Sequence, residues 1–303
     1  MIYLITNCTN VKKIPTNDNL LLRNYRSNTL ESISFTWNEN IKNTENNQFI
    51  EARNLYAGVS WKAILEAEKN FALINDTRLL ISSAGYGLIE SDKKITSYGI
   101  TFANGHEDSI RNFKSLKDKN ITSFWWNLIN KFNIKSLDHP IIFIAVSYEY
   151  LIAMQNTINA LIENFSTNVF IVVLSQKKLP SSYEKNILRF DSRFNSYEKG
   201  TVSTAIPRFI KWLSKEITRK NLALDHCTLQ NYINSFFEKY EEYIMPIRNN
   251  LSDNEILKCI EIQIKEKEIN NKTKGLRNLR SMGYACGQDR YNKLFKKIMK
   301  EDL

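Results

Sequence analysis

The chain of 303 residues is long enough to bury a large hydrophobic core, with room for one large domain and a small one. Apolar residues make up 43% of it, which is typical of a globular protein and excludes a disordered one. The longest apolar run, residues 141–147, is far shorter than the roughly 20 residues of a membrane helix. The formal net charge of +10 bears on partners and solubility rather than on the fold.

The cysteines and histidines show no spacing typical of a metal site. They are Cys8, Cys227, Cys259 and Cys286, and His106, His139 and His226. We therefore expect no cofactor, although a metal held partly by Asp or Glu would leave no recognisable spacing. The N-terminus, MIYLITNCTN, lacks the basic segment and cleavage site of a signal peptide. We expect a cytoplasmic protein with free thiols and no membrane association.

Apolar segments alternate with amphipathic ones along the first two thirds of the chain. The strand pattern covers residues 2–6, 78–83, 141–147 and 168–174. The helical pattern covers residues 49–71 with a break at Gly58, 124–132, a segment through Tyr150 and Met154, and 201–217. Residues 11–47 read as a long excursion with one short helix. This alternation predicts an α/β fold, with a mainly parallel sheet flanked by helices.

The adjacent Trp125 and Trp126 cannot share one face of the helix at 124–132. We expect one of them in the core and the other at a cleft or the surface.

Beyond Leu222 the sequence has no strand pattern. Helices are expected at 228–244 and 253–269, and two short ones around Gly283 within 273–300. Ser252 and Glu255 fit a capping box. We divide the chain into an α/β domain, residues 1–220, and a small, basic, all-helical C-terminal region, residues 221–303.

Three polar clusters follow predicted strands, at residues 7–10, 82–87 and 147–150. Ligands of parallel sheets bind at the carboxyl ends of the strands, so we expect these clusters to form the site. The two glycines of the AGYG segment, residues 84–87, would let a backbone approach a phosphate. The same pattern is also typical of a plain strand-to-helix turn.

Five segments in chain order resemble the YaaA-like superfamily. They are LYAG at 55–58, SSAGYGLI at 82–89 followed by Ile95 and Tyr98, SFWWNL at 123–128, IIFIAVSYEYL at 141–151 and KGTVSTAIPRFI at 199–210. The resemblance covers roughly residues 1–215. It implies a YaaA-like fold associated with DNA.

Some members of that superfamily act in oxidative stress. Others belong to bacterial phage-defence systems that place 7-deazaguanine bases in DNA, where a YaaA-like component converts the 7-cyano base to the 7-amide. The NCTN, GYGL and DSI segments and the basic tail look closer to this second kind. The resemblance thus implies nitrile hydration on 7-cyano-7-deazaguanine in DNA, with other proteins of such a system as further partners. The alternatives are a non-enzymatic DNA-binding protein of the stress response and an enzyme for free nucleobases or nucleotides.

For the catalytic role we select Cys8, Asp108 and Glu149. A thiolate at Cys8, stabilised by a helix N-terminus or by Lys12 or Lys13, could attack the nitrile carbon. Asp108 is a candidate proton donor or water activator, and Glu149 could supply acid–base chemistry. The plain alternative for Cys8 is a small buried thiol. The candidate substrate-binding residues are Asn7, Thr9, Ser83, Tyr86, Gly87, Tyr98, Ser147 and Tyr150.

Residues 272–300 carry nine basic residues against one acid, Asp289. Two short basic helices around a glycine are the outline of a helix-turn-helix-like DNA grip. The alternative is a solvated helical pair that packs on the main domain. Our candidate DNA-binding residues are Lys272, Lys274, Arg277, Arg280, Arg290, Lys293 and Lys297, together with Arg208. Phosphate contacts would not read sequence, so a base would have to be recognised elsewhere, after flipping into the strand-end cleft.

Overall fold

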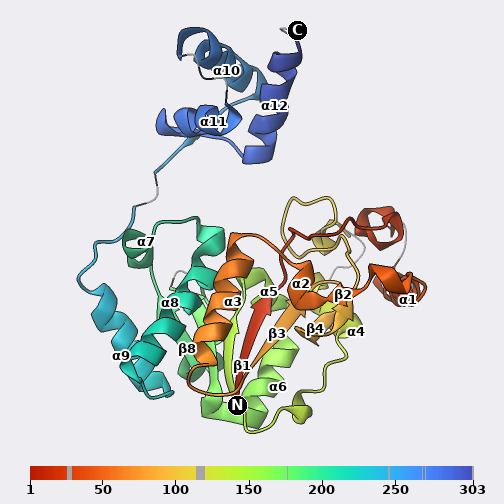
Figure 1. Cartoon of the computed structure of the whole chain (residues 1–303), viewed down its shortest axis with the longest axis vertical. Helices are drawn as coiled ribbons and strands as arrows, with labels where there is room; N and C mark the ends of the chain where they lie inside the picture. Colours follow the sequence, from red (N-terminus) through yellow and green to blue (C-terminus); the bar gives the residue numbers. More distant parts are fainter. Residues whose placement is uncertain are drawn as a thin grey trace. The chain divides into compact units, whose positions relative to one another are not determined.

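The computed structural model describes residues 1–25, 29–113, 120–175, 177–244, 246–267, 269 and 271–301 (Figure 1). The side chains of Asn46, Glu266, Lys267, Asp289, Lys300 and Glu301 lie outside this description. Asp289 and Lys300, which were counted among the charged residues of the tail, are therefore not described further. The chain forms two compact units, Met1–Tyr243 and Ile244–Leu303, which are described separately.

The first unit contains a six-stranded sheet in the order β4-β3-β1-β6-β7-β8. Its strands are β1 (Ile2–Asn7), β3 (Thr77–Ser83), β4 (Gly87–Glu90), β6 (Ile141–Ala145), β7 (Val169–Leu174) and β8 (Ile187–Phe190). All neighbours pair in parallel except β3 and β4. The predicted α/β class with a mainly parallel sheet is confirmed, and the four predicted strands correspond to β1, β3, β6 and β7.

Both faces of this sheet are covered. In β1, red in Figure 1, residues 2–6 are all buried although successive side chains point to opposite faces. Helices α3 (Val59–Phe71) and α8 (Ala205–Lys220) pack on each other, α3 also on β1 and β3, and α8 also on β6 and β7. Helices α4 (Ile121–Ile129), α5 (Tyr148–Ala153) and α6 (Gln155–Phe165) form a second group.

The remaining elements of the first unit are short or lie at its edge. The expected excursion contains helix α1 (Leu30–Lys42), and β2 (Ile50–Glu51) pairs with β5 (Lys94–Ile95). Helix α2 (Ala52–Leu55) precedes the break at Gly58, and α7 (Arg193–Tyr197) follows β8.

Helix α9 (His226–Phe237) belongs to the first unit. Its apolar face, Leu229, Ile233 and Phe237, is buried, and the helix packs on β8. The division between units therefore comes after residue 243 rather than after residue 220. The strand β8 that α9 covers was not among the predicted strands, so the partner of this helix could not be foreseen.

The AGYG segment forms the turn of the β3–β4 hairpin, neither a phosphate-binding loop nor a strand-to-helix turn. Its carbonyl groups are directed into the core, where Trp125 Nε1 donates to Ala84 O and Trp37 Nε1 to Gly85 O, both at 2.8 Å. Gly87 has a φ of +73°, a conformation that favours glycine. The glycines therefore serve a tight turn under a layer of tryptophans.

Both tryptophans of α4 are in the core, which corrects the expectation that one of them reaches a cleft or the surface. Trp125 and Trp126 are each fully buried. Trp126 Nε1 donates to Thr157 Oγ1 of α6 at 2.9 Å, while Trp125 points to the hairpin turn. A helix covered by neighbours on two sides can bury adjacent residues.

The second unit has its own core. It consists of β9 (Asn249–Asn250), α10 (Asp253–Lys267), α11 (Lys272–Ser281), β10 (Tyr284–Ala285) and α12 (Gln288–Glu301). Its buried residues are Ile256, Ile260, Leu276, Leu279, Cys286, Tyr291, Phe295 and Ile298. Ser252 and Glu255 form the predicted capping box, because each accepts the other's backbone N–H. The helical C-terminal region is thus confirmed, with Gly283 at a φ of +85° in the turn between α11 and α12.

Within the described ranges, none of the helices combines the length and apolarity that a membrane crossing requires.

The close packing of Gly87 in the hairpin turn leads to a prediction about stability. A Cβ at Gly87 would lie 2.6 Å from the Cα of Asn130, so Gly87→Ala must displace backbone. Gly105 has a similar φ of +74°, but a Cβ there would meet nothing within 4 Å. We expect Gly87→Ala to lower the free energy of unfolding by about 1–3 kcal/mol more than Gly105→Ala, measured by urea denaturation. Equal losses in the two variants would show that conformational strain, and not crowding, accounts for the effect.

Candidate functional site

The main cavity lies where the chain reverses its direction across the sheet. From β1 the chain proceeds to β3 on one side, and later to β6 on the other, so loops leave these carboxyl ends in opposite directions. A cavity of about 560 Å³ opens at the ends of β1, β6 and β7. Its walls come from residues 7–10, 147–151, 173–174, 202–203 and 205–207, with Ser60, Thr101, Ala103 and Lys177. The size is that of a small-molecule or single-base pocket.

Cys8 is held at the inner wall of this cavity. It follows β1 directly, and its backbone N–H donates to Ser82 O on β3 at 2.9 Å. The residue is 7% exposed, and its Sγ lies 3.0 Å from Tyr150 Oη on α5. A thiol and a phenol are therefore in hydrogen-bond contact at the carboxyl ends of two adjacent parallel strands.

A chain of hydroxyl groups lies beside the thiol. Tyr98 Oη is 2.7 Å from Ser83 Oγ and 2.9 Å from Tyr56 Oη. Ser83 Oγ already accepts the N–H groups of Gly85 and Tyr86, so its own proton is directed to Tyr98. Each of these hydroxyl groups is buried and has a partner.

Burial raises the pKa of Tyr56, Tyr98 and Tyr150 well above the usual value, and negative charge on Cys8 raises each of them further. The three phenols therefore stay protonated at neutral pH. Tyr150 is consequently a permanent hydrogen-bond donor next to the sulfur.

Asp108 is placed away from this cavity. Its buried carboxylate accepts three hydrogen bonds from Arg23, from the backbone N–H at 3.0 Å, Nε at 2.9 Å and Nη2 at 2.6 Å. It lines a second cavity, of about 260 Å³, which shares only Asn10 and Thr101 with the first. With its oxygens held by Arg23, Asp108 locks a loop, and the structure does not bring it to Cys8 as the expected proton donor.

Glu149, in contrast, lines the main cavity and is half-buried. Among the described residues its carboxylate has no hydrogen bond or ion pair. It is therefore available to take a proton or to bind a polar substrate group.

The candidate substrate-binding residues separate into two groups. Asn7, Thr9, Ser147 and Tyr150 line the main cavity. Asn7 Oδ1 accepts the N–H of Ser147 at 3.0 Å, which fixes the start of α5 to the end of β1. Ser83, Tyr86, Gly87 and Tyr98 are absent from the lining, since they build the hairpin turn and the hydroxyl chain.

Several cavity residues were missed in the sequence analysis, among them Ser60, Thr101, Lys177 and Ser203. Lys177 follows β7 in the polar segment SQKK, residues 175–178. The rule that selected the other strand ends applies there too and could have found it. Ser60, Thr101 and Ser203 lie on segments that approach the cavity only in three dimensions.

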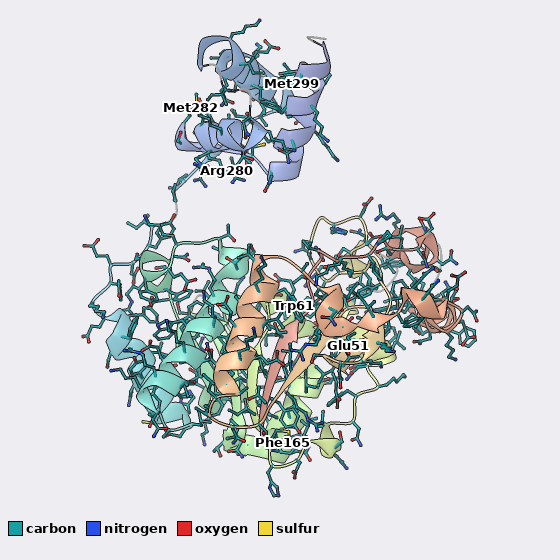
Figure 2. The ribbon with its side chains drawn as sticks, viewed as in Figure 1. Glu51, Trp61, Phe165, Arg280, Met282 and Met299 are labelled. Carbon is teal, nitrogen blue, oxygen red and sulfur yellow. The ribbon has the colours of Figure 1, made fainter. Side chains whose placement is uncertain are left out.

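Three of the four arginines among the candidate DNA-binding residues have hydrogen-bond partners within the fold. Buried Arg208 donates to the carbonyls of Glu198 and Thr201 and to the side chains of Asn195 and Thr204. Arg280, labelled in Figure 2, donates to Cys286 O through Nε and Nη2. Arg290 binds Asp253 and Leu251 O. We therefore assign these three side chains to the fold rather than to phosphates.

The other cations of the tail are exposed and have no ion pair or hydrogen bond among the described residues. They are Lys272, Lys274 and Arg277 on α11 and Lys293, Lys296 and Lys297 on α12. These six are free for an anionic partner.

Among the described residues, no group of three or more His, Cys, Asp or Glu side chains is arranged to hold a metal ion.

The role of Asp108 is testable through stability. Asp108→Ala would leave the Arg23 guanidinium without its main partner, and we expect a loss of about 1–3 kcal/mol in the free energy of unfolding. The matched control is Glu107→Ala, because Glu107 also pairs with Arg23 but is 57% exposed. That control should lose less than about 1 kcal/mol in the same denaturation experiment. If Asp108→Ala unfolds like the wild type, the carboxylate is not structural.

Comparison of the sequence with known proteins gave no assignment. No family model matches the chain, and no curated protein matches it significantly. The geometry of the cavity and the charge of the second unit therefore carry the functional argument.

Proposed function

We propose that the first unit hydrates the nitrile of 7-cyano-7-deazaguanine in DNA to the 7-amide, with Cys8 as the nucleophile. The observation that carries this proposal is the contact of 3.0 Å between the Cys8 thiol and the Tyr150 phenol in the wall of the cavity. The choice of substrate rests on the five segments that resemble the YaaA-like superfamily. The proposal places the protein in the cytoplasm, together with other proteins of a DNA-modification system.

The first step is attack of the Cys8 sulfur on the nitrile carbon. A C–S bond forms, one π bond of the nitrile breaks, and the nitrogen receives the Tyr150 proton. Tyr150 recovers a proton from the thiol, so the net transfer runs from sulfur to nitrogen and leaves a thioimidate. Because the pKa of Tyr150 is raised by burial, its proton is present for this step at neutral pH.

The second step is addition of water to the thioimidate carbon. The Glu149 carboxylate takes a proton from the water as the C–O bond forms and delivers it to the imidate nitrogen, which becomes an amino group. The C–S bond then breaks as the hydroxyl group of the tetrahedral intermediate becomes the amide carbonyl, and the proton of that hydroxyl group returns to the sulfur. Nitrile plus water gives amide, so the reaction needs no oxidant or reductant.

A base inside duplex DNA cannot reach a cavity of this kind. The nucleotide has to be flipped out of the stack, which costs a few kcal/mol. The cavity of about 560 Å³ has room for one base, and Leu151, Val173 and Ile206 give it an apolar wall. Exposed cations of the second unit would hold the phosphate backbone meanwhile.

The proposal is tested by digestion and nucleoside mass spectrometry of DNA that carries 7-cyano-7-deazaguanine. We expect the wild type to form the amide, Cys8→Ala to form none, and Tyr150→Phe to be slower by about 10²-fold, since it loses the proton donor. Cys227→Ala, which removes an exposed thiol, is the control and should behave as the wild type.

Conversion by Cys8→Ala at the wild-type rate would contradict the role of the thiol. Conversion of the free nucleoside but not of DNA would instead assign a small-molecule substrate. No conversion by any variant would reject nitrile hydration altogether.

A second candidate function is DNA binding without chemistry, in protection of DNA under stress. It is favoured by the six unpaired cations on α11 and α12, because such cations release counterions from DNA when they contact phosphates.

Binding by this surface predicts a specific dependence on salt. Each phosphate contact contributes about 0.9 to the slope of log K against log salt concentration, so the double variant Lys293→Gln/Lys297→Gln should lower the slope by about 1.8. The measurement is fluorescence anisotropy with a duplex at several salt concentrations. The control is Lys258→Gln/Lys265→Gln, which removes the same charge from α10. Equal slopes for the two double variants would mean that net charge acts, and not the α12 surface.

A further inference from the structure

The second cavity, of about 260 Å³, adjoins the main one, because Asn10 and Thr101 line both. Its lining also contains Lys12, Arg23, Tyr98, His106 and Asp108. The volume lies below the usual range of pockets for drug-sized ligands, which indicates a small group rather than a second base.

The carboxylate in this lining is already satisfied. Asp108 accepts three hydrogen bonds from Arg23, so the two side chains neutralise each other at the cavity wall. Glu107 also pairs with Arg23, but it is 57% exposed and lies outside the lining, where solvent and salt screen its charge. Lys12 therefore leaves the lining with an excess of one positive charge.

Lys12 supplies an ammonium group without a fixed anionic partner. Its backbone is held by a bridge to Tyr56, and its Nζ lies 4.4 Å from the centre of the Tyr98 ring. Among the described residues the ammonium group has no hydrogen bond and no ion pair. Burial lowers the pKa of Lys12, since an ammonium group is withdrawn from water at a cost that an aromatic ring returns only in part. An anion in the cavity would balance this charge.

His106 adds a second donor to the same cavity. Its Nδ1 accepts the backbone N–H of Asp108 at 3.0 Å, so the neutral ring carries its proton on Nε2. Nε2 has no hydrogen-bond partner among the described residues. The two side-chain nitrogens that remain available are thus N–H donors, whereas the carboxylate oxygens are taken up by Arg23. This combination suits an anionic ligand with oxygen acceptors.

We propose that the second cavity binds a phosphodiester group of the nucleotide whose base enters the main cavity, with Lys12 and His106 as its donors. The proposal rests on the proposed function, since it takes a flipped base in the main cavity as its starting point. Flipping turns a nucleotide about its backbone, so the phosphates on either side of its sugar stay beside the entrance. The walls that the two cavities share at Asn10 and Thr101 put the donors next to that entrance.

The charge of the lining favours a diester over a free phosphate. Each phosphodiester of DNA carries one negative charge, which matches the single excess charge of Lys12. A phosphomonoester carries about 1.5 to 2 negative charges at neutral pH. It would meet the Asp108 carboxylate, and Arg23, the other cation of the lining, is already paired.

The experiment measures binding of a thymidine–deoxyguanosine–thymidine trinucleotide to the full chain by isothermal titration calorimetry. The trinucleotide is used with normal phosphodiester linkages and with uncharged methylphosphonate linkages. We expect the wild type to prefer the charged form, and Lys12→Met to lower the ratio of the two affinities by about tenfold, because it loses a charge-assisted hydrogen bond. Lys12→Arg keeps the charge and should retain most of the ratio.

Two further variants sharpen the measurement. His106→Asn keeps an acceptor at the position of Nδ1 and removes the Nε2 donor, so we expect it to lower the ratio by about threefold. Lys13 carries the same charge as Lys12 one residue further on, but it is exposed and lines neither cavity. Lys13→Met is therefore the matched control and should keep the wild-type ratio.

A wild-type ratio in folded Lys12→Met would overturn the proposal, as would an equal loss in Lys13→Met. Thermal unfolding reports whether each variant is folded, and Lys12→Gln is the second variant if Lys12→Met is not. Deoxyguanosine 5′-monophosphate identifies the source of the phosphate. If it binds as tightly as the trinucleotide, with the same dependence on Lys12, the assignment to DNA is overturned in favour of a free nucleotide.

The assay contains no nitrile and is repeated with Cys8→Ala, in which the preference for the charged trinucleotide should persist. A preference that depends on Lys12 supports the phosphate site whether or not the chain hydrates a nitrile. Failure of the phosphate site is therefore distinguishable from failure of nitrile hydration, which would leave the affinity ratios unchanged.

Discussion

The parallel pairing of β1 between β3 and β6 is the constraint on which the site depends. Ile5 lies opposite Leu80 on one side and Ile144 on the other. A slip of one residue would exchange the two faces of the strand and bury the wrong side chains, so the apolar pattern fixes this register. The position of Cys8 follows directly, because it is the second residue beyond the last strand pair with β6. Its contact with Tyr150 is thus set by the sheet, and not by a loop.

The hydroxyl chain beside the Cys8 thiol lies outside the cavity lining, and its buried polar groups satisfy one another. Ser83 accepts two backbone N–H groups and donates to Tyr98, which contacts Tyr56. Trp37 of α1 and Trp125 of α4 donate hydrogen bonds to the carbonyl groups of the hairpin turn. Within the described residues, Trp212 Nε1 is the buried side-chain polar atom left without a partner. A network satisfied in this way holds reactive groups in one geometry.

The sequence was sufficient for four of the six strands of the sheet and for half of the candidate substrate-binding residues. The end of a strand can be recognised in the sequence because the apolar run stops there. Selecting the polar residues after each strand identified Asn7, Cys8, Ser147 and Tyr150, which line one cavity. The AGYG segment was misleading because glycines after a strand suit a hairpin turn and a phosphate loop equally well. The tryptophans that decide between them are 41 and 48 residues away in the chain. The partner of Asp108 could not be foreseen for a similar reason, since Arg23 precedes it by 85 residues.

Arginine and lysine side chains have different roles in this protein, and the amino-acid composition does not show the difference. The planar guanidinium suits fixed carbonyl and carboxylate partners, and Arg208, Arg280 and Arg290 are used in this way inside the fold. Lysines make up five of the six described free cations on α11 and α12, and a lysine ammonium group interacts with a phosphate as a point charge. Point charges give affinity but no reading of bases. If the protein acts on one modified base, selection must therefore occur in the cavity of the first unit. There the Glu149 carboxylate, which has no partner among the described residues, can accept hydrogen bonds from the base edge.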